Sequence, residues 1–146
     1  YWHTRRMVVD HADADDVLQN TFIKIWKGLP NFRLDSNIFT WTYRIATNES
    51  LTFLRKKKET TRFDDVEYSL SQNLEADVYF DGNEAQAKLQ HAISTLPEKQ
   101  RAVFNLKYFD EMKYKEMSEI LETSEGALKA SYHHAVKKIE EFLKTD

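Results

Sequence analysis

The chain has 146 residues and a net charge of −3, and only three Gly and two Pro interrupt a composition rich in Leu, Lys, Glu and Ala, which favours a mostly helical protein. It has no cysteine, which excludes disulfides, thiolate metal sites and cysteine nucleophiles. No apolar run approaches the roughly 20 residues that cross a bilayer and no signal-peptide pattern opens the chain, so we expect a cytoplasmic protein without membrane insertion of its own.

The first third of the chain predicts two helices. Residues 1–9 already have a helical pattern, and because the chain opens without Met we expect that the N-terminal end of a longer protein is missing. The next helix is predicted from Asp13 to Lys27, with Asp13 as its cap and residues 28–30 as its end. Five apolar residues fall on one side of it at helical spacing, Val17, Leu18, Phe22, Ile25 and Trp26, and of these Phe22 and Ile25 are expected to lie in the core.

A polar loop at 31–37 precedes a long helix that is predicted to run to about Lys58, capped by Ser36 or Asn37. Its expected core face holds Ile38, Trp41, Ile45 and Ala46. Around it, cations (Arg44, Arg55, Lys56, Lys57 and Lys58) alternate with aromatic residues (Phe32, Phe39, Tyr43 and Phe53). Such a mixture suits single-stranded nucleic acid, since rings stack on unpaired bases while cations follow the backbone. By composition alone, core packing accounts for most of these rings.

Charge divides the chain into three parts. Residues 1–58 hold ten Lys and Arg against six Asp and Glu, residues 59–83 hold one Arg against seven acids, and residues 84–146 hold ten basic and eleven acidic residues. Residues 59–83 show no sustained period and are too long for a loop inside one compact domain. We therefore predict an all-α protein in which a flexible acidic linker at 59–83 joins two small helical domains, 1–58 and 84–146.

The last part predicts four helices. The first carries Ala85, Leu89, Ala92, Ile93 and Leu96, and Pro97 starts the second, whose buried side is Val103, Phe104 and Tyr108. A short helix at 114–121 has Met117, Ile120 and Leu121 as core candidates. Ser124 caps the last helix, whose apolar stripe is Leu128, Tyr132, Ala135, Val136, Ile139, Phe142 and Leu143.

A short helix, a three-residue turn and a capped helix together predict a helix-turn-helix at 114–139, which holds the second helix at an angle suited to a major groove. The face opposite the stripe presents Lys129, Ala130, His133, His134 and Lys137. Lysine reaches phosphates or guanine, histidine can donate or accept at a base edge, and alanine permits close approach. A helical hairpin with a solvated outer face explains the spacing equally well.

Four segments, in this order, resemble the characteristic parts of sigma-70-type factors of bacterial RNA polymerase. They are DADDVLQNTFIKIW at 13–26, WTYRIATN at 41–48 followed by LRK at 54–56, LPEKQRAVF at 96–104, and SEGALK at 124–129 continuing to the lysines at 137–138. The first two resemble region 2 and the last two region 4. Nothing resembles region 3, which points to the extracytoplasmic-function (ECF) class.

The resemblance implies a factor that binds core polymerase and directs promoter-specific initiation. The helix at 13–26 would dock on the clamp helices of the largest subunit through Asp15, Asp16, Gln19, Asn20, Lys24 and Trp26, although Asp15 and Asp16 also suit a helix start. Region 2 would read and melt the minus-ten element, holding a flipped base, through Phe32, Arg33, Ser36, Asn37, Asn48, Arg55 and Lys56. Region 4 would read the minus-thirty-five element through Lys129, Ala130, His133, His134 and Lys137.

The chain departs from the commoner family pattern in region 4. Ser131 and His134 stand where Arg is frequent, and Ala127 and Ala130 stand where Thr and Ser are frequent. Glu111 and Glu122 occupy positions often held by glycine. In the family the linker enters the positively lined RNA exit path, where Asp64, Asp65, Glu67, Glu75 and Asp77 could imitate a nucleic-acid backbone; a solvated tether explains these acids equally well.

The partners implied are core RNA polymerase, through its clamp helices and flap, promoter DNA and an anti-sigma factor, and no metal or other cofactor is implied. An enzyme is not expected, because the five histidines are scattered and no motif for catalysis occurs. The alternative is a stand-alone helix-turn-helix regulator that does not depend on core polymerase. It explains residues 84–146 but leaves the segments at 13–26 and 41–58 unexplained.

Overall fold

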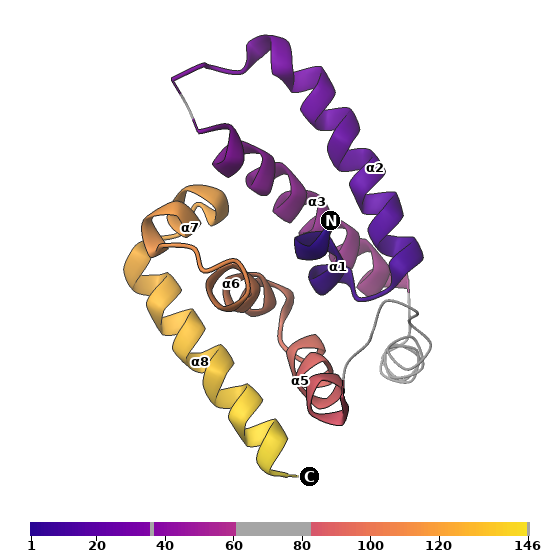
Figure 1. The fold of residues 1–146 in the computed structure, drawn as a ribbon, viewed down its shortest axis with the longest axis vertical. Coiled ribbons are helices and arrows are strands. Elements are labelled where there is room, and N and C mark those ends of the chain that lie inside the picture. The colour runs from indigo at the N-terminus through magenta and orange to yellow at the C-terminus, as the bar shows by residue number, and fades with distance from the viewer. Residues whose placement is uncertain (36, 61–82, 146) are drawn as a thin grey trace.

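The protein is described here by a computed structural model covering residues 1–35, 37–60 and 83–145. Its elements are α1 (Trp2–Val8), α2 (His11–Gly28), the short 3-10 helix η1 (Leu29–Asn31), α3 (Ile38–Thr60), α5 (Glu84–Ser94), α6 (Glu98–Tyr108), α7 (Tyr114–Leu121) and α8 (Glu125–Lys144). No strand occurs in these ranges, so the all-α prediction is confirmed (Figure 1). Ser36, the linker acids at 64–77 and most of the predicted linker lie outside the described residues.

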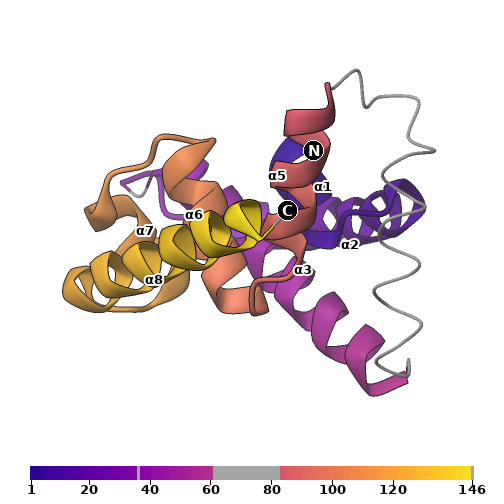
Figure 2. The ribbon, with the colours of Figure 1, turned by 90° about the horizontal axis from the view of Figure 1, so that it is seen from below.

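Two groups of helices lie side by side. In the first, α2 packs against α3 and both contact α1; in the second, α8 packs against α5, α6 and α7. Helix α6 of the second group connects it to the first, because it contacts α8 on one side and α1 and α3 on the other (Figures 1 and 2). Helix α7 also packs against α3. The two groups of helices are therefore in direct contact.

Helix α2 begins earlier than predicted and buries a different face. Its cap is Asp10, whose side chain accepts a hydrogen bond from the Asp13 backbone N–H, rather than Asp13. The buried stripe is Ala14, Val17 and Thr21. Small residues on this stripe allow the neighbouring helices to come close, and the larger rings are left outside.

The prediction that Phe22 lies in the core was therefore wrong, since Phe22 is 63% exposed, and Trp26 on the same helix is 78% exposed. The last residue of α2 also lies close to α3, because a Cβ on Gly28 would lie 2.8 Å from the Trp41 ring. Glycine is required at this position by the tryptophan packed against it.

Helix α3 also buries residues other than those predicted for its core face. Its most buried residues are Thr40, Thr47 and Ser50, whereas Ile38, predicted for the core, is 52% exposed. Two of the buried hydroxyls have partners: Ser50 donates to the Ala46 carbonyl at 2.8 Å, and Thr47 Oγ1 is hydrogen-bonded to His3 Nε2 at 2.8 Å. Short hydroxyl side chains thus line this contact, and those of Thr47 and Ser50 are hydrogen-bonded. The helix also continues to Thr60, two residues past its predicted end at about Lys58.

The C-terminal helices follow the prediction more closely. Pro97 immediately precedes α6, and the Ser124 side chain caps α8 by accepting from the Ala127 backbone N–H. One core cluster joins α5, α6 and α8, and a second joins α6, α7 and α8; their buried residues are Ala92, Ile93, Leu96, Phe104, Ala135 and Ile139, and Val103, Leu106, Met112, Met117, Ile120 and Leu128. Ala85, Tyr108 and Leu143, predicted to be buried, are exposed.

Arg101 of α6 joins the ends of two other helices. Its Nη1 donates to the Met7 carbonyl of α1 at 2.7 Å, and its Nη2 donates to the Ser94 carbonyl at the end of α5. Burial lowers the pKa of Arg101 to about 10, so the guanidinium stays charged at neutral pH. A cation at two helix C-terminal ends also interacts favourably with both helix dipoles.

We expect Arg101→Met to lower the free energy of unfolding by about 3 kcal/mol, because it leaves several buried carbonyls without a donor. Urea unfolding followed by circular dichroism measures the change. Lys99→Met, at an exposed position of the same helix, is the matched control and should shift stability by less than about 0.5 kcal/mol. Equal effects of the two substitutions would contradict the role of Arg101.

The two glutamates at positions often held by glycine adopt left-handed backbone conformations. Glu111, between α6 and α7, has φ 50°, and Glu122, between α7 and α8, has φ 51°. A side chain in this region of backbone space costs roughly 1 kcal/mol because its Cβ approaches the following carbonyl. Both turns keep the conformation that a glycine would adopt without strain.

Glu111→Gly is expected to raise the free energy of unfolding by about 1 kcal/mol, since glycine removes the strain at an exposed position. Urea unfolding followed by circular dichroism measures this change as well. Glu119→Gly, in the interior of α7, should instead lower stability by about 1 kcal/mol. A loss of stability in Glu111→Gly would show that the glutamate side chain contributes more than its backbone strain costs.

Candidate nucleic-acid and polymerase interfaces

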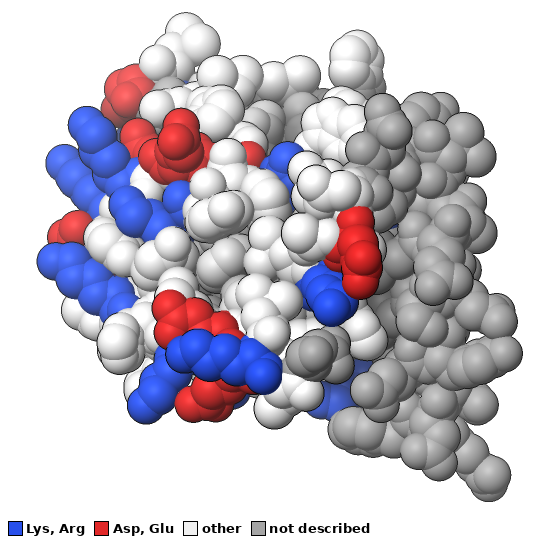
Figure 3. Space-filling view, turned by 60° about the horizontal axis from the view of Figure 1, so that its bottom comes forward, with Lys and Arg blue, Asp and Glu red and all other residues white. Residues whose placement is uncertain are grey.

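The outer face of α8 is directed to solvent. Leu128, Ala135 and Ile139 are buried, which turns the opposite side of the helix outward. All five residues predicted to contact DNA lie on that side and are exposed: Lys129, Ala130, His133, His134 and Lys137. Lysine and arginine side chains, with acidic side chains among them, lie along the left edge of the molecule in Figure 3. The geometry is that of a helix free to enter a groove.

In the described part of the loop before α3, one polar side chain is engaged by the backbone of the following helix. Asn37 Oδ1 accepts from the Phe39 backbone N–H at 2.9 Å, so this side chain caps α3 and keeps only its amide N–H₂ for another partner. Phe32 packs against the Trp41 ring, with 4.8 Å between ring centroids. Arg33 is exposed, and the neighbouring Leu34 is 97% exposed. The loop can therefore offer an apolar side chain together with a cation.

Along α3, three of the predicted contacts, Asn48, Arg55 and Lys56, are exposed. Lys57 differs, because it forms an ion pair with Asp13 of α2. Of the aromatic residues, Phe39 is exposed, whereas Phe53 packs against the buried cluster that contains Met7 and Val17. The stacking surface predicted from the sequence is thus smaller than its composition suggested.

The outward face of α2 combines charged and apolar side chains. The six predicted polymerase contacts are exposed, namely Asp15, Asp16, Gln19, Asn20, Lys24 and Trp26, and Lys24 forms an ion pair with Glu49 of α3. The exposed apolar residues on this helix and just after it are Phe22, Ile23, Trp26 and Leu29. An exposed apolar patch of this kind is typical of surfaces that bind another protein. Sequence analysis missed Phe22 because its spacing is also that of a core residue.

Comparisons with known proteins match these two groups of helices to one family. Residues 1–60 match Sigma-70 region 2, and residues 86–139 match Sigma-70, region 4. The chain is 30% identical to the ECF RNA polymerase sigma factor SigW of Bacillus subtilis (strain 168), over 95% of this chain and 80% of that protein. The chain belongs to the sigma-70 family, in its ECF class.

This sigma factor is similar to other members as well. It is 34% identical to the RNA polymerase sigma factor SigZ of the same organism, over 93% of this chain and 76% of that protein. Among solved structures, it resembles the sigma factor RpoE in complex with the anti-sigma factor NepR from Bartonella quintana, with TM-score 0.75 and 21% identity over 99% of this chain and 89% of that one. CnrH in complex with the cytosolic domain of CnrY gives TM-score 0.70 and 23% identity over 99% and 79%.

The family assignment gives names to the groups of helices. Helices α1 to α3 form region 2 of the sigma factor, and α5 to α8 contain region 4, whose helix-turn-helix is α7, the turn at 122–124 and α8. Within the described ranges, no helix is long and apolar enough to cross a membrane, and no cluster of side chains could hold a metal ion. The candidate binding surfaces are the outward faces of α2 and α8 and the loop between α2 and α3.

Proposed function

We propose that this RNA polymerase sigma factor divides its work between three surfaces. The outward face of α2 docks on the clamp helices of core polymerase, through Asp15, Asp16, Gln19, Asn20, Lys24 and Trp26. The loop after α2 and the exposed side of α3 read and melt the minus-ten element, through Phe32, Arg33, Ser36, Asn37, Asn48, Arg55 and Lys56. The outward face of α8 reads the minus-thirty-five element through Lys129, Ala130, His133, His134 and Lys137, while region 4 lies near the polymerase flap.

The observation that carries this proposal is the exposure of two separate helix faces, on α2 and on α8, whose opposite sides are buried in region 2 and region 4. The α8 face is polar and basic, which suits DNA. The α2 face is apolar with acidic neighbours, which suits a protein and would repel phosphate. We therefore infer domains at 1–58 and 84–146 with a connecting segment at 59–83, of which residues 59 and 60 still belong to α3.

We infer three further properties. The sigma factor acts in the cytoplasm, where core polymerase and promoters are found, and it serves as an initiation factor without catalytic chemistry of its own. It also has an anti-sigma partner, since the sigma factor RpoE, which shares its fold, is found in complex with the anti-sigma factor NepR. The stand-alone regulator is not favoured, because region 2 occupies residues 1–60.

The test is transcription in vitro with purified core polymerase and a library of upstream sequences. The expected result is a set of transcripts whose templates share two short motifs at one fixed spacing, and no such selection with core polymerase alone. Tight, sequence-specific binding of duplex DNA in the absence of core polymerase would instead support the stand-alone regulator.

A further inference from the structure

Two adjacent histidines lie on the outward face of α8. His133 and His134 are both exposed, and the centroids of their rings are 6.1 Å apart. Within the ranges that the structure describes, neither ring takes part in a hydrogen bond or an ion pair. Both rings can therefore gain a proton without breaking an existing contact of the protein.

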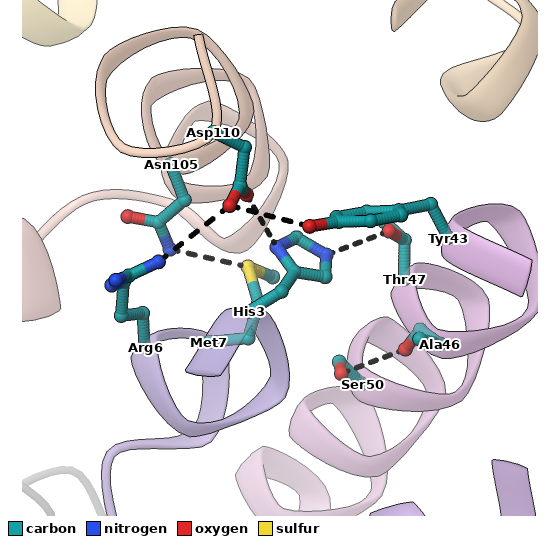
Figure 4. A network of polar contacts seen from close by, with 9 residues as sticks. All are labelled: His3, Arg6, Met7, Tyr43, Ala46, Thr47, Ser50, Asn105 and Asp110. Atoms are coloured by element: carbon teal, nitrogen blue, oxygen red, sulfur yellow. Dashed lines mark hydrogen bonds and ion pairs between the residues drawn. The ribbon is translucent and has the colours of Figure 1, made fainter. Parts of the chain in front are cut away.

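The other three histidines are engaged by the protein itself. His3 is buried, and its Nε2 is hydrogen-bonded to a threonine of α3 (Figure 4). His11 Nε2 lies 3.5 Å from the Asp15 carboxylate. The His91 ring packs edge-on against the Phe142 ring, with 5.2 Å between centroids. The pair on α8 thus differs from these three in presenting unengaged rings to solvent.

On α8 itself the charged groups closest to the two rings are cations. Three lysines lie one helical turn from one ring or the other: Lys129, Lys137 and Lys138. Lys129 Nζ lies 5.7 Å from the centre of the Tyr114 ring, so this cation is tied to α7. The closest acids on the helix are Glu140 and Glu141, which lie about two turns away. The surroundings of the rings on this helix are therefore basic.

In the described part of the chain, the helices that pack against α8 supply no carboxylate partner to the two rings. Helices α5, α6 and α7 contact the buried side of α8, opposite the histidines. Their charged and titratable side chains are Glu84, Lys88 and His91 on α5, Glu98, Lys99, Arg101, Lys107 and Tyr108 on α6, and Tyr114, Lys115, Glu116 and Glu119 on α7. Among the described residues, none of these acids forms an ion pair with α8. A positive charge at position 133 or 134 is therefore left for an external anion.

Duplex DNA is the external anion that this face is proposed to bind. Histidine is the side chain whose charge ordinarily changes between about pH 5 and 8. A protonated imidazole donates from both nitrogens and attracts phosphate, whereas the neutral ring donates from one nitrogen and carries no charge. A complex with DNA favours the protonated form, so binding takes up protons. By linkage, the affinity for DNA then rises as the pH falls.

We propose that His133 and His134 make recognition of the minus-thirty-five element by this sigma factor depend on pH: acidification charges both rings and tightens the contact of α8 with DNA. The proposal rests on the sigma-factor function proposed above and adds a means of regulating its region 4 surface. Lys129 and Lys137 supply charge that is present at neutral pH, and the two histidines add up to two positive charges below it. An acid shift inside the cell would act directly on promoter affinity.

The experiment measures binding of promoter DNA by the full chain together with core polymerase, at about pH 6 and at about pH 8. One labelled duplex carries a promoter selected by transcription in vitro, and a matched duplex has its minus-thirty-five element scrambled. Affinity is measured by fluorescence anisotropy at several salt concentrations. Circular dichroism at both pH values confirms that each variant is folded, as expected for substitutions at exposed positions.

Three variants separate the charge of the rings from other effects of pH. His133→Gln with His134→Gln keeps hydrogen-bonding side chains that cannot be protonated. His133→Lys with His134→Lys carries both positive charges at either pH. His91→Gln is the control, because it removes the remaining histidine of region 4 from α5, away from the outward face of α8.

For the wild-type chain we expect the affinity for the intact promoter to rise about ten-fold from pH 8 to pH 6. The slope of log affinity against log salt concentration should steepen by about 1–2, since each added phosphate contact contributes about 0.9. The glutamine pair and the lysine pair should each change by less than about two-fold, with the lysine pair binding more tightly than the glutamine pair at pH 8. His91→Gln should keep the pH response of the wild type.

Two results would overturn the proposal while leaving the proposed function intact. One is an equal pH response in the wild type and the glutamine pair, and the other is an equal response on the intact and scrambled promoters while the intact one is still preferred. A holoenzyme that does not distinguish the two duplexes at either pH would defeat the proposed function of region 4 and this inference together.

Discussion

Replacing Lys129 and His133 together by alanine is expected to reduce promoter-specific transcription by about 100-fold or more while the affinity for core polymerase stays the same. Both side chains are exposed on the outward face of α8, and neither contributes to the buried stripe of Leu128, Ala135 and Ile139. Loss of one base contact and one phosphate contact costs roughly 1–3 kcal/mol each. Transcription in vitro from the selected promoter measures the effect.

Lys138→Ala provides the control for this prediction. Lys138 is also exposed on α8, but its Nζ donates to Gln100 of α6 at 3.1 Å and so lies away from the recognition face. The Lys138→Ala variant should retain nearly full promoter-specific transcription. Weaker binding of core polymerase in the Lys129 and His133 double variant would contradict the assignment of α8 to DNA alone.

Truncating Phe22 and Trp26 to alanine is expected to weaken core polymerase binding by about 100-fold without loss of stability. Both rings are more than half exposed in the free chain, so their removal leaves no cavity in region 2. Exposed aromatic residues in a protein interface contribute about 1–2 kcal/mol each, and about 2.7 kcal/mol for the pair corresponds to the 100-fold loss. Affinity for labelled core polymerase and urea unfolding of the same variants test both parts of the prediction.

Two comparisons sharpen this experiment. Leu34→Ala removes an even more exposed apolar side chain from the loop after α2 and should leave the affinity for core polymerase unchanged. Asp16→Ala with Gln19→Ala should weaken binding more modestly, since the rim of an interface contributes less than its apolar centre, and should leave the choice of promoter unaltered. If Phe22→Ala unfolded the protein instead, the sequence prediction that this ring is a core residue would be restored.

The helices and most of their ends could be predicted from the sequence. Ser124 caps α8, Pro97 precedes α6 and residues 28–30 end α2, because caps and breakers act through contacts within a few residues of chain. The outward face of α8 could be predicted as well. Its stripe of apolar residues is regular, and the opposite side carries polar residues, so only one orientation buries the stripe.

Tertiary structure decided which face of α2 is buried. Apolar residues lie on more than one side of this helix, and Phe22 and Trp26 have the same helical spacing as core residues. Periodicity cannot separate a core from a docking surface, since both are apolar. The choice depends on the partners: Ala14, Val17 and Thr21 fit closely against α1 and α3, where a large ring would not fit.

The contact between regions 2 and 4 was likewise decided only by the tertiary structure. His3, Arg6 and Tyr43 meet Asp110, and Met7 meets Arg101, across most of the length of the chain. Residue types and local spacing determine helices, caps and the amphipathic faces that are available. They carry no information about which side chains from distant helices will share one buried carboxylate, because that pairing depends on how the completed helices pack against one another.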